Sequence, residues 1–211
     1  MNTNVNLEAP LAGLALLATI FLIFVTAIVL IHSLFVRKLH RAKVMTLAIA
    51  AIVALYGSAV VAFSFTSHYN LLARGQEKHF CELDCHLAYS IVNVASDPAS
   101  LPGDQPVRVT IKTRFDETTI APSRGNGLLY PNARVLTLYD DKGNAYAPQS
   151  QSGTPFTTPL RPGESYTTDV LFNLPAGATP AKLLINEADW ITHVVIGHEN
   201  SPLHKKTEFQ L

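Results

Sequence analysis

The chain has 211 residues, of which 48% are hydrophobic and 15% charged, with 16 basic and 16 acidic side chains. Nothing in the chain is basic enough to suggest that it binds nucleic acid. The length allows one or two domains, and the overall average conceals two different parts. Residues 1–66 hold four of the basic residues and one acidic residue, whereas residues 67–211 hold the other 12 basic and 15 acidic residues.

Two apolar runs without a charged residue, residues 9–36 and 44–66, follow a short N-terminal segment of residues 1–8. Each run exceeds the roughly 20 residues that a helix needs to cross the core of a bilayer. A cleaved signal peptide is the alternative for the first run, but that run is too long, has no basic segment before it and is followed by a second one. The sequence therefore predicts two transmembrane helices, with the lipid bilayer as a partner.

A basic link, residues 37–43 (RKLHRAK), joins the two runs and holds four Lys/Arg in seven residues. Basic loops stay on the cytoplasmic side of a membrane. We therefore expect both termini and residues 67–211 on the outer, periplasmic side of the bacterial inner membrane. Thiols in that compartment are normally oxidised or bound to a metal or haem.

Small residues recur at every fourth position of the second run, at Ala50, Ala54, Ser58 and Ala62. They line one face of the expected helix and let another helix approach closely. The first run of the same hairpin is the simplest partner for this face, and a helix of another subunit is the alternative. His32, near the cytoplasmic end of the first run, is expected at the membrane interface rather than as a cofactor ligand.

Residues 87–200 contain short alternating segments separated by turns, the pattern of an all-β sandwich. Residues 135–146 predict a hairpin whose turn contains Asp140 and Asp141. The two aspartates fit turn chemistry better than a calcium site, which needs several oxygen ligands at alternate positions. Further strands are expected at residues 107–115, and in the segments SYTTDVLFNLP, AKLLIN and WITHVVIG.

The segments LYDDKGNAYAP and LRPGESYTTDVLFNLPAGATPAKLLI resemble bacterial immunoglobulin-like domains of unknown function. The shared pattern is an Asp-Gly hairpin, a Pro-Gly-Glu turn and a strand ending in Phe-x-x-Pro, and it covers residues 80–200. The resemblance implies an immunoglobulin-like sandwich of the kind used in adhesion, scaffold and accessory modules. A two-helix anchor is not a general feature of that family.

The two cysteines of the chain, Cys81 and Cys85, lie in HFCELDCHLAYS, within an expected neck of residues 67–86 before the first strand. The simplest interpretation is a disulfide around Glu82, Leu83 and Asp84, which needs only an oxidising compartment and would pin the neck. Read as Cys-x-x-x-Cys-His, the same stretch is a lengthened haem c attachment motif with His86 as ligand. A mononuclear copper or zinc site, with the two thiolates and His79 or His86, is the other alternative.

The order of two helices and an outer β-domain is similar to that of subunit II of cytochrome oxidase. The binuclear copper motif of that subunit is Cys-x-x-x-Cys-x-x-x-His with a nearby methionine. Here Tyr89 stands where the histidine is required, no methionine lies near, and the motif precedes the sandwich. The resemblance in layout therefore does not extend to a binuclear copper centre.

Three histidines, His193, His198 and His204, lie close to the C-terminus. His193 and His198 would face opposite sides of a strand, so they form no chelating pair. His198 or His204 could complete a site with the two cysteines if the last strand lies near the first, and polar loop histidines are the simpler interpretation. The tail, residues 201–211, is too polar for a core, and its apolar ends predict docking on a surface.

No catalytic motif is present in the sequence, and no small-molecule substrate is evident. We therefore expect a non-catalytic accessory or scaffold subunit without a cofactor, associated with other subunits of a respiratory or photosynthetic membrane complex. The alternative is an electron-transfer or metal-handling protein that binds copper or haem c at Cys81, Cys85 and His86.

Overall fold

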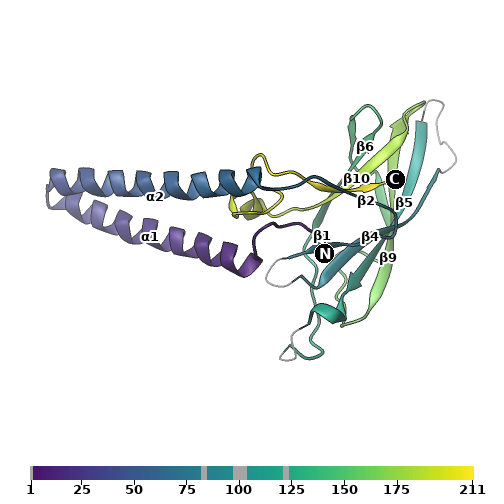
Figure 1. The fold of residues 1–211 in the computed structure, drawn as a ribbon, viewed down its shortest axis with the longest axis horizontal. Helices are drawn as coiled ribbons and strands as arrows, with labels where there is room; N and C mark the ends of the chain where they lie inside the picture. The colour runs from purple at the N-terminus through teal and green to yellow at the C-terminus, as the bar shows by residue number, and fades with distance from the viewer. Residues whose placement is uncertain (1, 82–84, 97–103, 121–123) are drawn as a thin grey trace. The chain divides into compact units, whose positions relative to one another are not determined.

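The structure, a computed structural model, describes residues 2–81, 85–96, 104–120 and 124–211. The chain divides into two compact units, each built from separate stretches of sequence. A β-domain contains residues 1–4, 68–190 and 206–211, and a helical unit contains residues 5–67 and 191–205. Figure 1 shows the elements of both units, with the colour following the chain from the N-terminus to the C-terminus.

The helical unit is a hairpin of two long helices, α1 (Ala9–Phe35) and α2 (Leu39–Phe65). Each has 27 residues and is long and apolar enough to cross a membrane, as the sequence predicts. The second helix begins earlier than expected, because residues 39–43 of the basic link are helical rather than part of a loop. Leu, Arg, Ala and Lys are favourable helix formers, and the chain reverses at Arg37, whose φ of 57° lies in the left-handed region.

The small-residue face of α2 (Ala50, Ala54, Ser58 and Ala62) is exposed along its whole length. The buried residues of α2 are instead Ala42, Val60 and Ser64. The expectation that α1 covers the small-residue face is therefore wrong, because α1 packs on a different side of α2. Large apolar side chains elsewhere on both helices are also exposed, among them Leu14, Leu17, Phe21, Phe24, Leu47 and Leu55, as a lipid-facing surface requires.

The β-domain is a sandwich of two sheets, which confirms the predicted fold class (Figure 1). The six-stranded sheet has the order β1 (Asn2–Thr3), β3 (Lys78–Phe80), β4 (Leu87–Ser96), β5 (Asp104–Phe115), β9 (Ser165–Pro175) and β8 (Ser150–Gly153). The five-stranded sheet has the order β2 (Asn70–Leu72), β11 (Thr207–Gln210), β10 (Pro180–Glu187), β6 (Arg134–Asp140) and β7 (Ala145–Tyr146). Both sheets are mixed, since β1 pairs in parallel with β3, and β2 with β11.

The core lies between the two sheets and is filled by alternate residues of the long strands. In β5 and β9 these are Val107, Val109, Ile111, Val170, Phe172 and Leu174, and the facing sheet contributes Leu138, Leu183, Ile185 and Phe209. The predicted alternation of residues 107–115 is therefore confirmed. Polar residues between these positions, such as Thr110 and Asp169, hydrogen-bond to each other on the opposite face of the sheet.

Three sequence expectations about the ends of the β-domain are wrong. The expected neck contains β2 and β3, so Cys81 lies between two strands rather than before the first one. The polar tail contains β11, an inner strand with Phe209 completely buried. Trp190–Val194, expected as a strand, is a 3-10 helix, η2. Strands of three or four residues that contain Lys, His or Glu show no alternation long enough to recognise.

Candidate functional site

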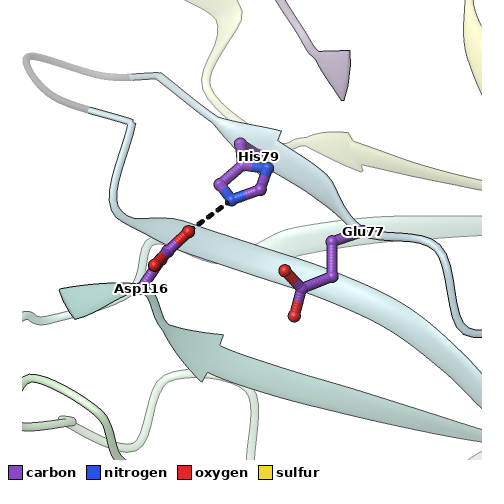
Figure 2. A group of neighbouring side chains, drawn as sticks. All are labelled: Glu77, His79 and Asp116. Atoms are coloured by element: carbon purple, nitrogen blue, oxygen red, sulfur yellow. Dashed lines mark hydrogen bonds and ion pairs between the residues drawn. The ribbon is translucent and has the colours of Figure 1, made fainter. Parts of the chain in front are cut away.

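Four charged or ionisable side chains meet on the outer face of the six-stranded sheet: Glu77, His79, Arg114 and Asp116. Strand pairing brings them together, because His79 and Arg114 both lie opposite the small residue Ala88 of β4. Glu77 and Asp116 are two positions away from His79 and Arg114 in sequence, and therefore project from the same face. Figure 2 shows His79 directed at Asp116, with Glu77 beside them.

Arg114 is the centre of this charged cluster. Its Nε and Nη2 atoms donate to the two carboxylate oxygens of Glu77, each at 2.8 Å. The same guanidinium lies 3.2 Å from Asp116 Oδ2 and 3.2 Å from Glu117 Oε2. His79 Nε2 lies 3.0 Å from the same Asp116 oxygen, Oδ2. A guanidinium that donates two parallel hydrogen bonds to a carboxylate fixes the geometry of the pair.

The electrostatics of the cluster favour the charged forms of Glu77, Arg114 and Asp116. Burial by itself would raise the pKa of Asp116, but hydrogen bonds from Thr118, His79 and Arg114 outweigh burial and hold that pKa well below its ordinary value. The hydrogen bonds from Arg114 likewise lower the pKa of Glu77. The two carboxylates in turn raise the pKa of Arg114. Glu77, Asp116 and Arg114 are therefore ionised at neutral pH.

Glu77, His79 and Asp116 are also the residues of this region that could hold a metal ion. One ligand atom from each lies within 4.8 Å of the others. Arg114 lies among them, however, and its guanidinium is already paired with both carboxylates. Because a divalent cation would have to displace or repel this guanidinium, the cluster favours a structural ion-pair network over a metal centre.

Cys81 and Cys85 form a disulfide with a Cα–Cα distance of 4.1 Å, as the simplest interpretation of the sequence predicts. The bond closes the connection between β3 and β4 instead of pinning a neck, and Glu82, Leu83 and Asp84 lie outside the described residues. The backbone N–H of Cys81 donates to Asn4 Oδ1 at 2.8 Å. Both sulfur atoms are in the disulfide, and a thiolate ligand or an attached haem would require this bond to be absent.

The two histidines next to the cysteines have separate protein partners. His79 is held by Asp116, whereas His86 stacks on the ring of Phe115 at a centroid distance of 5.6 Å and hydrogen-bonds through Nδ1 to Thr119 Oγ1. Tyr89, at the position where a copper motif requires histidine, is completely buried and packs edge-on against Phe80. These contacts belong to a folded domain core and its rim.

The C-terminal histidines lie in the helical unit, in residues 191–205. His198 is buried, and its Nδ1 accepts a hydrogen bond from the backbone N–H of Asn200 at 3.0 Å. His204 Nδ1 hydrogen-bonds to the carbonyl oxygen of Lys205. His193 lies in η2 rather than on a strand. His198 thus has a local structural partner, and its predicted part in a site with the cysteines stays a prediction.

The predicted turn chemistry of Asp140 is confirmed. Its carboxylate accepts hydrogen bonds from the backbone N–H groups of Lys142 and Asn144, the side-chain amide of Asn144 and the hydroxyl of Tyr146. The hydrogen bonds from Asn144 are the main cause that lowers the pKa of Asp140 to about 2. The carboxylate therefore stabilises the β6–β7 hairpin, and its acceptor capacity is used within the turn.

The sequence did not reveal the charged cluster, because Glu77 and Asp116 are far apart in the chain and lie together only through the pairing of β3, β4 and β5. The sequence does contain one indication of a polar site. The stretch from Arg114 to Glu117 places three charged residues at the end of an alternating strand. Such a strand end predicts a polar rim, but it does not identify the partner strand.

No known protein family matches this chain, and no curated protein matches it. Among solved structures, it is similar to an uncharacterized β-sandwich protein from Clostridium difficile 630. The similarity covers 69% of this chain and 95% of the other, with a TM-score of 0.42 and 8% sequence identity. So distant a likeness carries no information about function. The similarity in layout to subunit II of cytochrome oxidase finds no support in these comparisons.

Proposed function

We propose that this chain is a non-catalytic, membrane-anchored accessory subunit of a larger membrane complex. The observation that carries the proposal is the exposed small-residue face of α2, formed by Ala50, Ala54, Ser58 and Ala62. A row of small residues leaves a shallow channel along the helix. In membranes such a channel lets the backbone of a second helix approach closely. Because α1 packs elsewhere on α2, the proposed occupant is a helix of another subunit.

The charge distribution supports an outer position for the β-domain. All four basic residues of the hairpin lie at the α1–α2 turn (Arg37, Lys38, Arg41 and Lys43), which favours a cytoplasmic turn and outer termini. The Cys81–Cys85 disulfide fits the same compartment. We propose that the sandwich is immunoglobulin-like, because its sequence contains the hairpin and turn motifs of such domains. We further propose that the larger complex is respiratory or photosynthetic.

A non-catalytic role is supported by the way the β-domain uses its ionisable groups. Arg114 forms ion pairs with Glu77 and Asp116 in the charged cluster, and the carboxylate of Asp140 accepts hydrogen bonds from its own turn. General acid–base chemistry needs a group whose pKa lies near neutral pH. Hydrogen bonds move the carboxylates named here in the opposite direction, away from neutrality.

The test is gentle solubilisation of membranes that contain the native chain, followed by size separation under native conditions. We expect the wild-type chain to migrate with a larger complex and the Ala54→Leu variant to be released from it. Ala18→Leu is the matched control, because Ala18 is an exposed residue of α1 that receives the same added bulk. Recovery of the wild-type chain as a free monomer, or equal behaviour of the two variants, would contradict the proposal.

Visible absorption and metal analysis of the purified chain separate this role from electron transfer or metal handling. We expect a colourless protein with no bound metal and no free thiol, because both cysteines are in the disulfide. A Soret band, or bound copper that is lost in Cys85→Ser, would instead support the alternative function at Cys81, Cys85 and His86.

A further inference from the structure

An apolar groove lies between the two helices at the end where the hairpin turns. It has a volume of about 540 Å³ and is lined by Leu30, Leu34, Leu39, Ala42, Lys43, Thr46 and Leu47. The hydroxyl of Thr46 donates to the carbonyl oxygen of Ala42, so it offers its proton to the helix rather than to the groove. The volume falls within the roughly 300 to 1,000 Å³ typical of small-molecule sites. Lys43 is the one charged residue of the lining.

The groove opens beside a concentrated positive charge. Arg37, Lys38, Arg41 and Lys43 are all exposed, and residues 9–66 contain no acidic side chain to neutralise them. The start of α2 adds to this charge, since its N-cap residue Lys38 provides no side-chain hydrogen bond and its first turn holds no acidic residue. Uncapped N–H groups and the positive end of the helix dipole attract anions such as phosphate.

We propose that the groove and its basic rim form a binding site for one anionic phospholipid. An acyl chain fills the apolar groove, and the phosphate lies against Lys43 and the basic residues of the turn. The apolar walls of the groove contact the acyl chain and do not bind a free anion. The four positive charges attract the phosphate and do not bind an uncharged acyl chain. The inference rests on the helices lying in a membrane, and it is independent of the proposed accessory role.

The basic rim determines which lipid headgroup is preferred, whereas the groove determines where the acyl chain lies. Apolar side chains already face lipid tails in a bilayer, so filling the groove with an acyl chain gives little preference for one phospholipid over another. A Lys or Arg close to the membrane surface contributes about 1 kcal/mol toward an anionic lipid, which is roughly a fivefold change in affinity. Removing one charge should therefore weaken binding of an anionic lipid about fivefold and leave that of a zwitterionic lipid unchanged.

The experiment measures retention of added lipid by the full-length chain in detergent micelles, using native mass spectrometry. The probes are dioleoyl phosphatidylglycerol and dioleoyl phosphatidylcholine, which have the same chains and differ in charge. We expect the wild type to retain phosphatidylglycerol preferentially, Lys43→Gln to lose about fivefold in that preference, and Lys43→Arg to keep it. Lys142→Gln, at an exposed turn of the β-domain, is the control for the same loss of charge.

A second pair of variants tests the groove without altering charge. Thr46→Phe places a large side chain in the lining and should displace the bound lipid, whereas Thr26→Phe makes the same change in α1 away from the groove. Glycerol 3-phosphate, which has the head but no tail, should not compete with phosphatidylglycerol at equal concentration. If Lys43→Gln does not fold, Thr46→Phe and Thr26→Phe still test whether the lipid binds in the groove.

Three results would overturn the inference. Equal retention of the two phospholipids would remove the basis for an anionic site, as would identical losses in Lys43→Gln and Lys142→Gln. Competition by glycerol 3-phosphate would show a simple anion site without a lipid tail. Ala54 is not among the residues that line the groove, so failure of either proposal leaves the other to be judged on its own data.

Discussion

Lys78 Nζ donates a hydrogen bond of 2.8 Å to the backbone carbonyl oxygen of Ile185, and thereby joins β3 of one sheet to β10 of the other. The lysine is completely buried. It also donates to the carbonyl oxygen of Thr207 in β11 at 3.0 Å, and its ammonium lies 4.9 Å from the centre of the Phe80 ring. A buried ammonium is costly unless its donors are used, and these contacts use them.

Replacing Lys78 with Met should therefore destabilise the β-domain. The apolar stem is kept, but the carbonyl oxygens of Ile185 and Thr207 lose a buried donor, and we expect a loss of about 1–3 kcal/mol. Thermal or denaturant unfolding of the full-length chain in detergent measures this loss. Lys142→Met, at an exposed turn, is the control, and a Lys78→Met protein as stable as the wild type would show that the inter-sheet bridge contributes nothing.

Removing Arg114 should turn the charged cluster into a metal-binding site. In Arg114→Ala the two carboxylates lose their counter-charge, while Glu77, His79 and Asp116 keep ligand atoms within 4.8 Å of one another. We expect the variant to unfold at lower temperature than the wild type in the presence of chelator, and Zn²⁺ to restore much of the difference. Zn²⁺ should leave the wild type unchanged.

Arg108→Ala provides the control for Arg114, since Arg108 lies on the same strand and faces the carboxylate of Asp169 at 3.9 Å. That variant should show no response to Zn²⁺. Stabilisation of the wild type by Zn²⁺ to the same extent as Arg114→Ala would mean that the guanidinium does not keep metal out.

Loss of the Cys81–Cys85 disulfide should weaken the β-domain moderately. A bond across so short a loop restricts the unfolded chain only slightly, and the expected cost of the double Cys→Ser change is about 2 kcal/mol. Unfolding of the wild type with and without reductant measures the same quantity. A thiol assay on the unfolded, unreduced protein should find no free cysteine, and a full complement of thiols would contradict the disulfide.

Stability at acidic pH should depend on Asp140. Because its pKa is lowered to about 2 in the folded chain, while the unfolded value is near 3.9, its contribution is present above pH 4. That contribution is lost as pH falls from about 4 toward 2. The unfolding midpoint of the wild type should therefore fall more steeply over this window than that of Asp140→Asn, and parallel curves would disprove the assignment.

Some parts of the candidate site can be predicted from the sequence, and others cannot. The disulfide could be predicted because the sequence holds two cysteines four residues apart, on the side of the basic link that the charge rule predicts to be oxidising. The charged cluster could not, since it depends on the opposition of His79 and Arg114 to Ala88 across three strands. Likewise, the α1–α2 hairpin was predictable from hydropathy, whereas the side of α2 that α1 covers was not.

The sequence by itself determined the two membrane-type helices, the sandwich class, the Asp140 hairpin and the disulfide. Each depends on residues that are neighbours in the chain or on a periodicity along one element, and such patterns act locally. Only the tertiary structure decided that the C-terminal strand β11 enters the core, that Lys78 bridges the sheets and that Arg114 pairs with both Glu77 and Asp116. These features depend on strand register and long-range pairing, for which no single segment of sequence holds the information.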